Sequence, residues 1–150
     1  MKKWILIVVV WCVLLVGCNE KAYEPREIVG ETDVCKICNM SIVHNKYAGQ
    51  IVLKNGDYEM FDDLGCLMEY IDANGDEEIG AAFIKDSTEN EWIDVFKATF
   101  VYSKEYWTPM NYGVLAFKTK DAADKWMTTE GDGQVLVYKD LQDFNWGINQ

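Results

Sequence analysis

The stretch "GQIVLKNGDYEMFDDLGCLMEYIDA", residues 49–73, carries the clearest structural signals in the sequence. Two short apolar runs, 49–53 and 58–61, flank the tetrapeptide 54–57, "KNGD". Asn-Gly accepts the positive φ angles of a tight turn, so this arrangement predicts a β-hairpin. After the hairpin, apolar residues recur at positions i, i+3, i+4 and i+7, a spacing that predicts one buried face of a helix. These residues are Leu64, Leu67, Met68 and Ile71.

The ends of this helix also carry signals. Asp62 or Asp63 can cap its start, a role that we prefer for these carboxylates over acid or base catalysis. "NGDEE" (74–78) stops the helix, and "IGAAFIKD" (79–86) returns as a strand. Residues 47–86 therefore read as one β-β-α-β unit.

A second unit with the same order is predicted over residues 98–140. "TFVY" and "GVLAF" read as strands, followed by a helix that Thr119 caps and then by the strand "QVLVYKD". Ala122, Ala123 and Trp126 are expected to face inward from this helix. The connector 87–97 reads as strand or loop, and 141–150 as a C-terminal tail. We predict an α+β fold in which two similar units pack together, because each alone is too small to bury a good core.

The N-terminal residues are typical of an exported protein. Lys2 and Lys3 precede an apolar run, 4–16, that is shorter than the roughly 20 residues that a membrane-spanning helix needs. "LVGC" (15–18) resembles the lipobox of bacterial lipoproteins, which implies removal of residues 1–17 and lipidation of Cys18. An ordinary signal peptide or an uncleaved anchor is the alternative.

Residues 18–33 then read as a polar tether between this anchor and the domain. The resemblance places the protein on a cell membrane, held by the lipid bilayer and facing away from the cytoplasm. Whether the membrane is an inner or an outer one stays open.

Charge and cysteine content further limit the classes of function that the protein can have. Removal of residues 1–17 takes away two lysines and no acid, so the net charge goes from −11 to −13, which excludes a nucleic-acid partner. Three cysteines remain besides Cys18: Cys35, Cys38 and Cys66. An odd number outside the cytosol does not suggest a disulfide framework. At least one thiol is kept for another purpose or lies in the core.

The segment 34–46 is the candidate metal-binding segment. It holds Cys35, Cys38, Met40 and His44, the last being the chain's single histidine. Thiolate and thioether are soft donors that select Cu(I) over harder ions, and an imidazole could add to them. We therefore predict a Cu(I) site formed by these four residues. More distant sulfur atoms, in Met60, Cys66 and Met110, are expected in the core rather than at the metal.

Three other interpretations of the Cys35–Cys38 pair stay open. A structural zinc site needs four ligands, and the sequence offers only one histidine and one further cysteine to complete it. A thioredoxin-like redox pair should open a helix after a strand, whereas this pair precedes the first predicted strand. A simple structural disulfide is the third interpretation.

Taken together, the lipobox, "DVCKICNM" (33–40), the hairpin and "FDDLGCLMEY" (61–70) resemble the NosL family of nitrous oxide reductase accessory lipoproteins. The resemblance covers about residues 33–140. It implies two β-β-α-β units and a Cu(I) chaperone without enzymatic activity, working with an ABC-type transporter. Cys38 and Met40 would be family ligands, joined by Cys35, whereas His44 is our own addition.

The expected function is therefore that of a membrane-anchored, extracytoplasmic chaperone that delivers Cu(I) for the assembly of a copper enzyme. The resemblance implies nitrous oxide reductase as the client. The alternative is an extracytoplasmic thiol-disulfide protein that keeps the copper-site cysteines of its client reduced.

Overall fold

The computed structural model describes residues 22–146. The predicted signal peptide (1–17), Cys18 and the last four residues of the predicted tail lie outside the described residues. Within 22–146, no helix is both long enough and apolar enough to cross a membrane.

The first half of the chain forms a four-stranded antiparallel sheet with one helix. Its elements are β1 (Gly49–Leu53), β2 (Tyr58–Phe61), α2 (Leu64–Asn74), β3 (Ile79–Lys85) and β4 (Trp92–Asp94). The strand order is β2-β1-β3-β4. The predicted hairpin joins β1 to β2, and its turn places Gly56 at a φ of 98°. The connector, left open by the sequence, supplies β4, which pairs with β3.

The second half repeats this arrangement. It contains β5 (Thr99–Tyr102), β6 (Val114–Phe117), α3 (Lys120–Glu130) and β7 (Gln134–Val137), followed by the short helix α4 (Tyr138–Gln142). The strand order is β6-β5-β7, so β5 is central, as β1 is between β2 and β3. The predicted α+β class with two similar β-β-α-β units is confirmed.

Both helices begin at the predicted caps. The side chain of Asp63 accepts a hydrogen bond from the backbone N–H of Gly65, and that of Thr119 accepts one from Ala122. These bonds satisfy N–H groups that have no partner inside a helix. The four apolar residues predicted for the inner face of the first helix are all buried.

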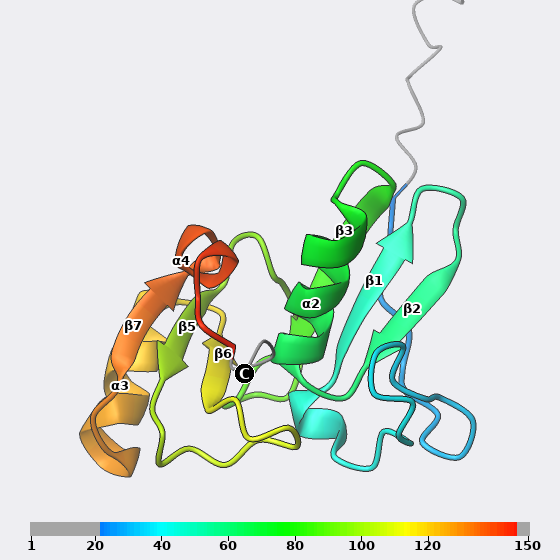
Figure 1. The fold of residues 1–150 in the computed structure, drawn as a ribbon. Coiled ribbons are helices and arrows are strands. Elements are labelled where there is room, and N and C mark those ends of the chain that lie inside the picture. Colours follow the sequence, from blue (N-terminus) through cyan, green and yellow to red (C-terminus); the bar gives the residue numbers. More distant parts are fainter. Residues whose placement is uncertain (1–21, 147–150) are drawn as a thin grey trace, which may run out of the picture.

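One core joins the two halves. It includes Ile51, Phe61, Leu67 and Ile84 from the first unit and Phe100, Ala116, Leu136 and Leu141 from the second and its following helix. Helix α2 lies between the two sheets in Figure 1, and it packs against β1, β2, β6 and α4. The ring of Tyr112 lies directly on Gly65, where an added Cβ would come within 2.1 Å of it. The main core is therefore shared by both units.

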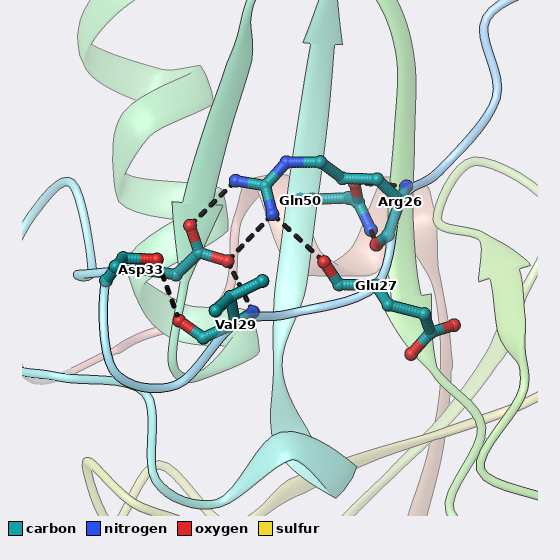
Figure 2. Close-up of polar contacts among 6 residues, drawn as sticks. Arg26, Glu27, Val29, Asp33 and Gln50 are labelled. Carbon is teal, nitrogen blue, oxygen red and sulfur yellow. Dashed lines mark hydrogen bonds and ion pairs between the residues drawn. The ribbon is translucent and has the colours of Figure 1, made fainter.

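The described part of the predicted tether is bonded to the first sheet, which differs from the expectation of a free linker. The buried amide of Gln50 accepts from the backbone N–H of Arg26 and donates to its C=O, at 3.0 and 2.8 Å. The guanidinium of Arg26 pairs through two nitrogens with both oxygens of Asp33, at 2.7 and 2.8 Å (Figure 2). This hydrogen bonding lowers the pKa of Asp33. The segment has no periodic pattern of apolar residues. Because it docks through polar groups, its contact with the sheet could not be predicted from such a pattern.

A buried carboxylate, Asp86, links the end of β3 to the second unit. Its Oδ1 accepts from the hydroxyl and backbone N–H of Thr88 and from the N–H of Glu89, and its Oδ2 accepts from the N–H of Lys118 at 2.7 Å. Burial opposes ionisation of this group, but the hydrogen bonds outweigh burial and lower its pKa.

Because this pKa is lowered on folding, the carboxylate contributes stability above the unfolded pKa of about 4, and the contribution is lost as pH falls through the folded pKa. We expect Asp86→Asn to lower the free energy of unfolding by about 1 to 3 kcal/mol at neutral pH, since an uncharged amide replaces an acceptor of charge-assisted bonds. Urea unfolding of both proteins should show this gap narrowing at acidic pH. A gap that stays constant with pH would contradict the assigned role.

Candidate metal centre

The segment carrying the cysteine pair forms a closed loop on the edge of the first unit. Val34 and Ser41 form an antiparallel bridge, and the N–H of Cys35 donates to the C=O of Met40 at 2.8 Å. Asn39 takes a left-handed conformation with a φ of 59°, which turns the chain between its two arms. The N–H of Lys36 donates to the C=O of Met60 in β2 and so ties the loop to the sheet.

Four potential ligands converge beneath this loop. The Sγ atoms of Cys35, Cys38 and Cys66 and a carboxylate oxygen of Asp62 all lie within 4.8 Å of one another. Cys35 and Cys38 come from the loop, Asp62 follows β2, and Cys66 lies in the first turn of α2. All three cysteines are free thiols. We call this group the thiol cluster.

Polar donors surround the sulfur atoms of the thiol cluster. The thiol of Cys66 hydrogen-bonds to Cys35, whose Sγ also accepts from the backbone N–H groups of Cys38, Asp62 and Ile37, and together they lower the pKa of Cys35. The same thiol–thiol bond, with burial, raises the pKa of Cys66. Burial raises the pKa of Cys38, although the N–H of Met40 donates to its sulfur. The cluster thus favours one thiolate, at Cys35, when no metal is bound.

The two neighbouring aspartates have separate roles. Asp63 caps α2, and its Oδ2 accepts from the N–H of Met110 in the second unit at 3.0 Å. Asp62 instead faces the thiol cluster, where its Oδ1 accepts from the thiol of Cys38 at 3.6 Å. The predicted cap is therefore Asp63, and the sequence did not assign Asp62 to the cluster.

The other two residues of the predicted metal set lie differently. The side chain of Met40 is 47% exposed at the rim of the loop, two residues from Cys38. His44 does not belong to the thiol cluster; its ring packs edge-on against Trp107, with centroids 5.0 Å apart. His44 directly precedes the short 3-10 helix η1 (Asn45–Tyr47) and is its N-cap residue.

All three distant sulfur residues lie in the core or against it, as predicted. Met60 is buried with Ile42 and Ala48, and Met110 packs against the main core. Cys66 is also buried, yet its sulfur belongs to the thiol cluster, which the sequence analysis did not expect. It lies 28 positions after Cys38 in the chain, so no short motif connects the two.

The donor set has a clear chemical preference. Three thiols offer soft sulfur donors, which bind thiophilic ions such as Cu(I) or zinc, while one carboxylate adds a hard oxygen. The sequence offers too few ligands in short motifs for a structural zinc site. The fold, however, brings together four groups that could complete such a site. The geometry therefore indicates a site for a thiophilic metal ion, and both Cu(I) and zinc belong to this class.

Comparisons with known proteins agree with this architecture. A protein-family model described as NosL matches residues 27–145. The crystal structure of the copper chaperone NosL from Shewanella denitrificans is similar in fold, with a TM-score of 0.69 and 16% sequence identity. The match covers 79% of this chain and 96% of that chain. A search of curated proteins gave no match.

Proposed function

This chain belongs to the NosL family, and from that premise we propose that it is a copper chaperone that binds Cu(I) through Cys35, Cys38 and Met40. The observation that carries the proposal is the convergence of three free thiols beneath a loop that exposes a methionine. Thiolates hold Cu(I) firmly, and an exposed thioether is a weak ligand that a partner can displace. His44 stays a predicted further ligand, and to join the site it has to leave the ring of Trp107.

The proposed role needs no catalytic step. Copper is the cargo, and it passes to a partner as one ligand after another is exchanged for a cysteine, methionine or histidine of that partner. The Cys38–Met40 edge of the loop suits this exchange because Cys38 is half-buried and Met40 reaches solvent.

The client and the anchor are further parts of the proposal. We take nitrous oxide reductase as the copper enzyme that is supplied, with an ABC-type transporter as a membrane partner, on the strength of the family resemblance. Lipid on Cys18 would confine the domain to the extracytoplasmic face of a membrane. Copper transfer to metal-free nitrous oxide reductase, measured by recovered activity, tests the client, and no transfer would exclude it.

The central test is a titration of the reduced full-length chain in detergent. Cu(I) is added in competition with a chromophoric chelator, and Zn(II) is titrated in parallel. We expect one tightly held Cu(I) per chain. No competition with the chelator would exclude the chaperone role.

Met40→Ala separates the chaperone from the thiol-disulfide alternative. Loss of the thioether is expected to weaken Cu(I) binding by about tenfold, equivalent to about 1.4 kcal/mol, and to leave the reduction potential of the thiols unchanged. Val43→Ala is a matched control, because Val43 is an exposed apolar residue of the same segment, 73% accessible. Equal Cu(I) affinity in both variants would remove Met40 from the ligand set.

A further inference from the structure

We propose that Cys66 completes an inner three-sulfur site with Cys35 and Cys38, into which Cu(I) moves after capture at Cys38 and Met40. This inference rests on the proposed function and adds to it a ligand and a direction of transfer. It gives the chaperone an exposed position for capture and release and a buried position for holding copper.

The spacing of the sulfur atoms suits a single ion. An ion about 2.3 Å from each of three sulfurs in a plane requires sulfur–sulfur separations of about 4 Å. The three Sγ atoms lie within 4.8 Å of one another, so small side-chain adjustments suffice. Cys66 and Cys35 lie close together in this cluster, and both are fully buried. No backbone movement is needed to bring the third sulfur to the metal.

Cys35 and Cys66 belong to the main core, yet their sulfur atoms face other potential metal ligands. A cysteine that only fills space has apolar neighbours and no need of hydrogen-bond donors. Here the sulfur of Cys66 lies within 4.8 Å of two further thiols and of a carboxylate oxygen of Asp62, and that carboxylate accepts from the thiol of Cys38. Cys66 lies in the first turn of α2, which places its sulfur beside those of the loop.

Exposure decreases in the order in which copper would move. Met40 lies half in solvent, Cys38 is half-buried, and Cys35 and Cys66 are fully buried. In the inward step the thioether of Met40 leaves Cu(I), while Cys35 and Cys66 each bind through sulfur as their thiol protons pass to solvent. Copper stays in the Cu(I) state throughout, so the step needs no oxidant or reductant. The reverse exchange returns copper to the exposed edge of the loop.

The role of Asp62 differs between a Cu(I) site and a zinc site. A carboxylate is a hard donor that Cu(I) does not select, whereas zinc accepts three cysteines and a carboxylate in a tetrahedron. In the metal-free structure Oδ1 of Asp62 accepts from the thiol of Cys38 at 3.6 Å, and once Cys38 binds Cu(I) as a thiolate this hydrogen bond is gone and Asp62 is not a ligand. Asp62→Asn should therefore change Cu(I) affinity far less than loss of Cys66 does.

The experiment compares Cu(I) binding by the reduced full-length wild type, Cys66→Ala, Asp62→Asn and Val95→Ala in competition with the chelator. Val95 is buried in the same core as Cys66 and offers no sulfur, so its variant controls for lost packing. We expect Cys66→Ala to bind Cu(I) about 10- to 100-fold more weakly than the wild type, at least the loss seen when a supporting partner of a ligand is removed. Val95→Ala should bind as the wild type does.

X-ray absorption keeps the inference testable if Cys66→Ala folds poorly. In the near-isosteric Cys66→Ser, the number of sulfur neighbours of bound Cu(I) should fall by one, and an unchanged number overturns the inference. Tight Cu(I) binding retained by Cys66→Ala also overturns it, but leaves the chaperone role intact. A wild type that binds no Cu(I) overturns both. Tight Zn(II) binding that Asp62→Asn abolishes, without Cu(I) binding, assigns the cluster to zinc instead.

Discussion

Cys38→Ser is expected to abolish Cu(I) retention against a chromophoric chelator. Cys38 belongs both to the exposed Cys38–Met40 edge and to the thiol cluster, so its loss removes a ligand from each position. We expect the affinity to fall by more than the roughly 10- to 100-fold typical of losing an outer partner of a metal ligand. The ultraviolet absorption of copper–thiolate bonds should fall with it.

The Cu(I) affinity of the wild type should also decrease as pH falls, because protons compete with the metal for thiolate sulfur.

The fold should survive the Cys38→Ser change, which makes its result interpretable. A serine hydroxyl at position 38 can still donate to Oδ1 of Asp62, as the thiol does at 3.6 Å. Circular dichroism and the urea midpoint should therefore stay close to those of the wild type. A stable Cys38→Ser protein that keeps wild-type Cu(I) affinity would contradict the proposed ligand set.

Gly113→Ala is expected to lower the free energy of unfolding by about 2 to 5 kcal/mol. Gly113 has a φ of 70°, which costs an alanine about 1 to 2 kcal/mol. An added Cβ would also lie 2.3 Å from the backbone oxygen of Ser103, and relieving such overpacking costs about 1 to 3 kcal/mol more. The same two residues are joined by a bond from the N–H of Ser103 to the C=O of Gly113 at 3.0 Å. The backbone segments at Ser103 and Gly113 therefore cannot move apart without losing this hydrogen bond.

Gly56→Ala is the matched control for this prediction. Gly56 has a φ of 98°, but nothing lies within 4 Å of an added Cβ. It should lose only the conformational part, about 1 to 2 kcal/mol. Urea unfolding of both variants separates the contributions. Equal losses in the two proteins would mean that the contact with Ser103 costs nothing.

Local signals explain why much of the fold was predictable. The hairpin depends on four consecutive residues, and each helix cap depends on a side chain and an N–H two or three positions later. The repeat of β-β-α-β in both halves follows from such local patterns. β4 was left open because a three-residue strand has too short a pattern to distinguish it from a loop. The docking of residues 22–33 was missed because polar groups hold it: the amide of Gln50 and the Arg26–Asp33 pair.

The candidate site likewise has residues that the sequence predicts and residues that only the fold brings to it. Cys35, Cys38 and Met40 stand close together in the sequence, so their chemistry could be read without a structure. Asp62 and Cys66 join the first two only because β2 ends and α2 begins beneath the loop. His44 shows the opposite case: it lies six residues from Cys38 in the chain, yet its ring packs on Trp107. Nearness in sequence does not fix the direction of a side chain.

Patterns within a few residues were enough to predict the order of strands and helices in both units and a pair of thiols next to a thioether, but not β4 or α4. Which sulfur atoms meet depends on the packing of the whole chain. The thiol of Cys66 reaches the loop because α2 packs between the two sheets and is capped by Asp63 at the point where the loop crosses β2. That placement results from burying one core shared by both units, and no local pattern encodes it.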